Sequence, residues 1–189
     1  MVEQKIINSI RRATHAGSWY DAQPEAQLTK YMKDVTCSLT TGQKLKAIIG
    51  PHAGFRYSGP TAAHAYINLQ SRAKDFDRVV LLGPSHKVYL DFVGTTACDQ
   101  WATPLGNLEI DKEAVDRLCQ ASNEADGVSF AKIAVKYEEN EHSLEMHLPF
   151  IKKVFADEGK PDVKLVPLMV GEIPKAKYKS YAKALLPLF

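Results

Sequence analysis

The sequence predicts an α/β fold with a mainly parallel sheet. Short apolar runs alternate along the chain with longer segments of helical periodicity, which is the pattern of parallel strands connected by helices. The chain has 189 residues, of which 45% are apolar and 24% charged, as in an ordinary globular protein. This length suffices for one domain with its own core. We therefore expect a single α/β domain over residues 1–189.

Strands are predicted where the apolar runs are densest, at 45–49, 78–82 and 163–170. Their content of Val, Ile and Leu is typical of strands that are buried on both faces. Pro167 interrupts the third run, and proline donates no backbone N–H to a sheet. It therefore indicates a sheet edge or a bulge at that point.

Helices are predicted at about 22–35, 60–71, 111–121, 144–157 and 174–186, with each end placed to within about 2–4 residues. Asp111 is the expected N-cap of the third helix. In the fourth helix, apolar residues recur at helical spacing and predict a face that packs on the sheet. These residues are Leu144, Leu148, Ile151 and Phe155.

Charge and cysteine content exclude several classes of protein. The 24 Lys and Arg nearly balance the 22 Asp and Glu, so the sequence predicts no surface for nucleic acid or anionic membrane. Residues 1–12 lack the apolar run of a signal peptide, and no segment approaches the ~18 apolar residues of a membrane span. An odd number of widely spaced cysteines indicates a reducing compartment. We expect a cytoplasmic protein.

Two histidines follow predicted strands in the same way. Ile49-Gly-Pro-His52 and Leu82-Gly-Pro-Ser-His86 each run from an apolar strand through Gly-Pro to a histidine. Loops at the carboxyl ends of parallel strands line the ligand crevice of an open α/β sheet, so both rings are expected at one edge. Imidazole suits Fe, Cu or Zn. Capping of two turns is the simpler alternative for these residues.

A third histidine-containing segment is Glu141-His-Ser-Leu-Glu-Met-His-Leu-Pro149. His142 and Glu145 are three residues apart and share a face if the segment is helical. This H-x-x-E pair is similar to part of a zinc hydrolase site, although H-E-x-x-H is absent, and an acidic helix start is an equal alternative. His147 lies five residues from His142 and remains a candidate ligand-binding residue.

Further candidate ligand-binding residues lie in two glycine-containing loops. His15 and Trp19 flank Gly17, where a histidine and an aromatic ring can line a pocket or anchor the N-terminal arm. Arg56 and Tyr57 follow His52 and can reach an anionic ligand, although a solvated arginine is the simpler interpretation. His64 is expected to pack rather than bind.

Six motifs, in this order, closely resemble those of the Memo family. They are His15-Ala-Gly-Ser-Trp-Tyr20, Pro51-His-Ala-Gly-Phe-Arg-Tyr57, Ala62-Ala-His-Ala-Tyr66, Leu82-Gly-Pro-Ser-His86, Thr103-Pro-Leu105 and Glu141-His-Ser-Leu-Glu-Met-His-Leu-Pro149. The resemblance implies a three-layer αβα fold like that of class III extradiol dioxygenases. It also implies that His52 and His86 are metal ligands, that Fe or Cu is bound with redox activity, and that Trp19 and Tyr57 occupy positions implicated in binding phosphotyrosine peptides.

The sequence departs from the family pattern at its end. The family continues into a strand, a loop that carries an aspartate and a histidine, and a cysteine that serves as third metal ligand. Cys37, Cys98 and Cys119 do not match that cysteine. We therefore expect that the chain lacks the C-terminal part of the family and that two histidines alone bind metal weakly.

Three functions follow from these observations. The first is a metal-dependent Fe or Cu oxidoreductase acting on a small molecule, with His52 and His86 as ligands and His142 or Glu145 assisting. The second is a non-enzymatic effector of cell motility that binds phosphotyrosine peptides. A zinc hydrolase based on His142 and Glu145 is the third. Metal content distinguishes the first from the second, whereas the sequence alone does not decide whether the chain is an enzyme.

Overall fold

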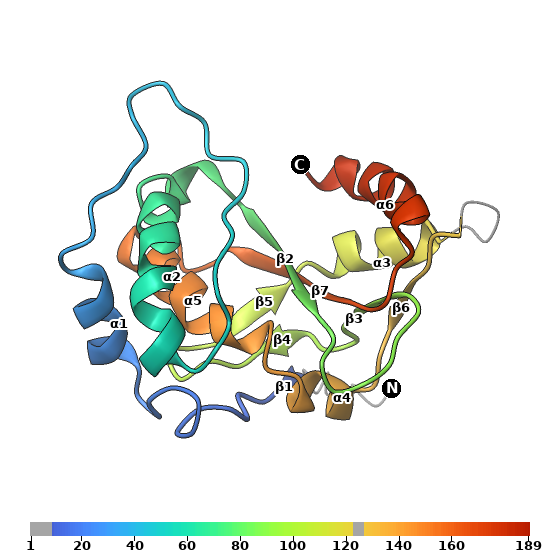
Figure 1. Ribbon diagram of the computed structural model, residues 1–189, viewed down its shortest axis with the longest axis horizontal. Helices are drawn as coiled ribbons and strands as arrows, with labels where there is room; N and C mark the ends of the chain where they lie inside the picture. Colours follow the sequence, from blue (N-terminus) through green and yellow to red (C-terminus); the bar gives the residue numbers. More distant parts are fainter. Residues whose placement is uncertain (1–8, 123–126) are drawn as a thin grey trace, which may run out of the picture.

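The computed structural model describes residues 9–122 and 127–189. It shows a mixed α/β fold with a curled, mainly parallel sheet between helical layers, as predicted (Figure 1). The strands are β1 (Ile10–Arg11), β2 (Arg78–Pro84), β3 (Val93–Thr95), β4 (Gln100–Trp101), β5 (Leu108–Ile110), β6 (Phe130–Lys132) and β7 (Lys164–Val170). Their order is β1-β4-β5-β7-β3-β6, with β2 paired to the other side of β7. Among the strands of the described residues, only the β3–β7 and β4–β5 pairs are antiparallel.

The helices lie on both sides of this sheet. The α-helices are α1 (Glu25–Met32), α2 (Phe55–Gln70), α3 (Lys112–Gln120), α4 (Val135–Asn140), α5 (Leu148–Asp157) and α6 (Tyr178–Leu185). Short 3-10 turns are η1 (Ala73–Asp75), η2 (Glu145–His147), η3 (Lys175–Lys177) and η4 (Leu186–Leu188). Helices α1, α2 and α5 pack together on one side, and α3 and α6 lie on the other (Figure 1).

Local sequence explains where several of these helices begin. The Asp111 side chain accepts a hydrogen bond from Ala114 N at 3.0 Å, which confirms the predicted N-cap of α3. Helix α2 starts at Phe55, five residues earlier than predicted, and includes Pro60. Pro60 is the sixth residue of α2, beyond the first four N–H groups that have no partner within a helix, so α2 lacks the one hydrogen bond that an N–H at this position would donate to the Arg56 carbonyl.

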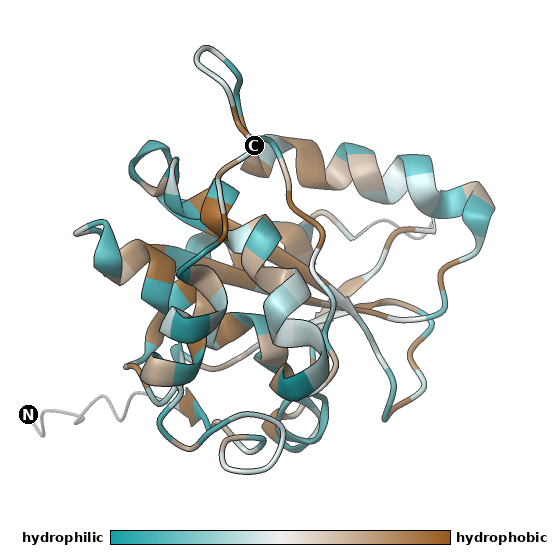
Figure 2. Cartoon of the chain, turned by 60° about the vertical axis from the view of Figure 1, so that its left-hand side comes forward, coloured by the Kyte–Doolittle hydropathy of each residue, from teal (hydrophilic) through white to brown (hydrophobic). Residues whose placement is uncertain are grey.

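The predicted core face of α5 is confirmed. Leu148, Ile151 and Phe155 are at most 1% exposed, and Leu144 just before the helix is 2% exposed. Figure 2 shows the corresponding pattern, with brown apolar segments in the central strands and teal polar residues on the outer faces of the helices. Within the described ranges, no helix combines the length and apolarity needed to cross a membrane.

Two strand predictions were wrong in detail. Residues 45–49 form no strand, and Ile49 is 96% exposed. This segment forms no backbone ladder with β2, whose partner in the sheet is β7. Burial of β2 on both faces is also contradicted, since Leu82 is 48% exposed.

Pro167 lies in the interior of the sheet, not at its edge. Strand β7 pairs with β2 on one side, and on the other side with β5 near its start and β3 near its end. Pro167 falls between these two partners, where Thr95 Oγ1 donates to its carbonyl oxygen at 2.9 Å. A proline is tolerated here because no strand requires its missing N–H.

Candidate metal centre

Three imidazoles meet beyond the carboxyl end of β2. His86 follows β2, His52 precedes α2, and His142 lies between α4 and η2. The ring centroids are 5.2 Å apart for His52 and His86, 5.7 Å for His52 and His142, and 4.6 Å for His86 and His142. One ligand atom from each lies within 4.8 Å of the others. His52 and His86 therefore lie as close together as expected, although only His86 follows a strand, because residues 45–49 before His52 form none. His142 joins them.

Two glycines allow this approach. A Cβ on Gly50 would lie 2.9 Å from the His147 ring, and one on Gly83 would lie 3.0 Å from Leu144 and Ser143 side-chain atoms. Both distances are shorter than a comfortable van der Waals contact. The glycine of each Gly-Pro step therefore lets the backbone that carries a histidine pack against residues 143–147, next to His142.

Glu141 orients His86. This carboxylate is 1% exposed and accepts from His86 N at 2.6 Å and from His86 Nδ1 at 3.0 Å. Burial alone would raise its pKa, but hydrogen bonds from Ser143 N and from the His86 backbone and ring outweigh burial and hold the pKa at about 2. Because the ionised carboxylate only accepts, His86 Nδ1 is the donor and Nε2 keeps a lone pair for a metal. Sequence reasoning did not single out Glu141, although it directly precedes His142.

His142 has the environment of a ligand rather than of a surface residue. Its Nδ1 is buried and finds no hydrogen-bond partner among the described residues, although Glu141 Oε1 lies 3.3 Å away. Burial lowers the pKa of both His52 and His142, and the neighbouring imidazole of His86 lowers it further. Neutral imidazoles are the form that binds metal. The chain thus offers three nitrogen ligands, one more than the sequence predicted.

Glu145 does not share this site with His142. It is 0% exposed and forms an ion pair with Arg11 at 2.5 Å. It also accepts from Tyr20 OH at 2.9 Å and from His15 N at 2.8 Å. The predicted pairing of His142 and Glu145 on one face is not found, because Glu145 is engaged with Arg11, Tyr20 and His15 while His142 lies in the histidine group. The zinc hydrolase hypothesis, which joined these two residues in one site, has no geometric support of this kind.

Of the remaining predicted residues, Trp19 contacts the histidine group, His147 is buried beside it, and the others are exposed. The Trp19 ring covers His142, with centroids 4.4 Å apart, and is 37% exposed. His147 is 7% exposed, with Nδ1 2.8 Å from Tyr66 OH, and burial lowers its pKa to about 4. Arg56 and Tyr57 are exposed on the first turn of α2. His64 is exposed too, so the expectation that it packs was wrong.

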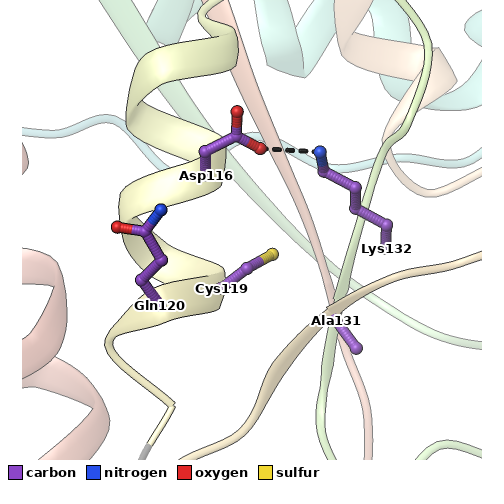
Figure 3. Close-up of a pocket in the computed structure, with 5 residues that line it drawn as sticks. All are labelled: Asp116, Cys119, Gln120, Ala131 and Lys132. Atoms are coloured by element: carbon purple, nitrogen blue, oxygen red, sulfur yellow. Dashed lines mark hydrogen bonds and ion pairs between the residues drawn. The ribbon is translucent and has the colours of Figure 1, made fainter.

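A separate hollow of about 410 Å³ lies between α3 and β6 (Figure 3). Cys119 faces it from α3, beside an ion pair of 2.6 Å between Lys132 and Asp116. Burial raises the pKa of the Cys119 thiol, which disfavours the reactive thiolate. The residues that line this hollow therefore do not suggest a second reactive site.

The fold and the site together define a three-layer α/β protein with a group of three histidines, at the end of a parallel strand, that could hold a metal ion. Comparison with known proteins refines this class. The family described as Memo-like protein matches residues 11–188, and the chain belongs to this family.

Curated relatives support the assignment. Protein memo-1 homolog of Caenorhabditis elegans is 38% identical over 174 residues, which cover 90% of this chain and 46% of the relative. Protein MEMO1 of Homo sapiens is 35% identical over 176 residues, covering 92% and 55%. Protein MEMO1 of Danio rerio is 35% identical over 178 residues, covering 93% and 56%. The chain thus spans about half the length of these relatives.

Proposed function

We propose that this chain holds one Fe or Cu ion through His52, His86 and His142 and supports redox chemistry at that ion. The observation that carries the proposal is the convergence of three ligand nitrogens within 4.8 Å of one another. Metal–nitrogen distances are about 2.0–2.1 Å, so the three rings must close inward slightly around an ion. Among the described residues, His142 Nδ1 has no hydrogen-bond partner, so no such bond at Nδ1 holds this ring against a small movement toward an ion.

The donor set supports a transition metal rather than Mg²⁺ or Ca²⁺. Imidazole suits Zn, Cu and Fe, whereas Mg²⁺ and Ca²⁺ require oxygen ligands. The resemblance to the Memo family adds the expectation of iron or copper. Three histidines leave at least one coordination position for water or a small molecule. When bound there, Fe or Cu would supply one-electron chemistry, while Glu141 fixes the ring of His86.

Metal titration of single variants tests the ligand set. The metal-free protein is mixed with one equivalent of Cu(II) or, without oxygen, Fe(II), and the bound metal is measured after gel filtration. We expect one equivalent in the wild type and at least about tenfold weaker binding in His52→Ala, His86→Ala and His142→Ala. The matched control is His64→Ala, because His64 is exposed on α2 and outside the group.

Trp19 supplies an independent optical signal. Its ring lies 4.4 Å from that of His142, so Cu(II) bound there should quench its fluorescence. Trp19→Phe should abolish this quenching, while the buried Trp101 remains as background. Binding that is equal in all four histidine variants would contradict the site. A site that binds Zn but yields no reducible Cu form would contradict the redox function.

A further inference from the structure

The chain contains two carboxylate–histidine pairs of the same construction. In each pair a buried glutamate accepts both the backbone N–H and the ring Nδ1 of one histidine. Glu141 holds His86 in this way at 2.6 and 3.0 Å, and Glu145 holds His15 at 2.8 and 2.9 Å. His86 belongs to the metal group. The matching hydrogen bonds around His15 therefore indicate that this ring is also oriented for binding.

The Glu145 pair fixes which nitrogen of His15 is free. Glu145 is paired with the buried Arg11 guanidinium at 2.5 Å and accepts from Tyr20 OH at 2.9 Å, so its carboxylate acts as an acceptor. His15 Nδ1 must then donate. In the neutral ring, Nε2 is left as a hydrogen-bond acceptor.

His15 lies next to the metal group but outside it. Its ring centroid is 6.2 Å from that of His142 and 5.7 Å from that of Trp19. It is not among the three residues whose ligand atoms lie within 4.8 Å of one another. At this separation His15 is suited to contact a molecule bound to the ion rather than the ion itself.

We infer that His15 is a ligand-binding residue that accepts a hydrogen bond, through Nε2, from an N–H or O–H group of a small molecule bound to the metal. The inference rests on the proposed metal function and deepens it by naming the class of ligand. Water, hydroxyl compounds and N–H heterocycles carry such a donor, whereas ligands without a donor gain nothing from His15. Glu145 acts through His15 and is therefore a positioning residue.

A matched pair of ligands tests this inference on the Cu(II)-loaded full chain. Imidazole carries an N–H donor, and 1-methylimidazole binds through the same nitrogen type without one. The dissociation constant of each is measured from the visible absorption of Cu(II) in the wild type, His15→Phe, His15→Ala and the control His64→Phe. The ratio of the two dissociation constants is compared between variants. Because the size of the methyl group affects this ratio equally in every variant, a change in the ratio reports the hydrogen bond.

The wild type and His64→Phe should favour imidazole over 1-methylimidazole by about 3- to 10-fold more than either His15 variant, as expected for the loss of one hydrogen bond. Affinity for Cu(II) itself should stay within about threefold in both His15 variants. A ratio that is unchanged in them overturns the inference, as does a loss of Cu(II) affinity above about tenfold in both. Cu(II) binding that is insensitive to His52→Ala would instead overturn the proposed function and the inference with it.

Discussion

Glu138→Gln is expected to make the stability of the protein rise more steeply with pH than that of the wild type between about pH 5 and 7. Glu138 is 2% exposed, and its Oε2 accepts from Thr96 Oγ1 at 2.9 Å. Burial raises its pKa from 4.5 to about 7. The folded protein therefore keeps a proton that the unfolded chain releases. The stability from this neutral carboxyl is complete below about pH 4.5 and is lost as the pH rises through about 7.

His147 has the opposite effect in the same pH range. Burial lowers its pKa from 6.5 to about 4, so the unfolded chain takes up a proton where the folded protein does not. Its contribution is therefore present above about pH 6.5 and is lost as the pH falls to about 4. Each displaced pKa corresponds to about 3 kcal/mol over its whole window, or about 2 kcal/mol between pH 5 and 7. In the wild type the contributions of Glu138 and His147 oppose each other, while the lowered pKa values of His52 and His142 act in the same direction as that of His147.

Urea unfolding of the metal-free protein at about pH 5, 6 and 7 measures this balance. From pH 5 to 7, the free energy of unfolding of Glu138→Gln should increase by about 2 kcal/mol more than that of the wild type, and that of His147→Gln by about 2 kcal/mol less. Carboxyls with a pKa near 2, such as Glu141, act below this range. A wild-type slope equal to that of Glu138→Gln would refute the reasoning, because Glu138 would then be ionised in the folded protein.

Three further substitutions test the packing. Phe155→Ala should lower the free energy of unfolding by about 3–5 kcal/mol, because Phe155 is 0% exposed; urea unfolding measures this, and a loss below about 1 kcal/mol would contradict the packing. Gly171→Ala should cost about 1–3 kcal/mol, since the new Cβ would meet the carbonyl group of Leu90; an unchanged thermal midpoint would exclude that clash. Asp111→Ala should cost about 1–2 kcal/mol by uncapping α3. Asp111→Asn can still cap but loses the charge that pairs with Arg78, so it should recover only part of the loss; thermal unfolding of both variants measures this, and an Asn variant no more stable than the Ala variant would contradict the cap.

The α/β class and the position of His86 could be predicted because both follow from local rules. Alternating apolar runs and helical segments predict parallel strands, and Gly-Pro-Ser-His86 predicts that His86 leaves the end of one of them. The 45–49 segment shows the limit of these rules. It has the composition of a strand, but a strand also needs a backbone partner, which composition does not supply.

The third ligand and its support could not be predicted for a related reason. A spacing of three residues predicts that His142 and Glu145 share one face of a helix, but the segment turns at residues 143–144 between them. The chain therefore sends His142 toward His86 and Glu145 toward Arg11. Which carboxylate serves which histidine depends on contacts between distant segments, as between Glu141 and His86, 55 residues apart. A sequence pattern within one segment carries no information about such contacts.

The ion pair between Arg11 and Glu145 also has a consequence for the order in which the protein assembles. The hydrogen bonds around it join residues up to 131 positions apart, as between Thr14 and Glu145. During synthesis at about 5–20 residues per second, the N-terminal arm waits several seconds before its partner leaves the ribosome. Closing so long a loop has a high entropic cost, so these contacts form late. Arg11, His15 and Trp19 are thus made well before Glu145 and are fixed in place only after it.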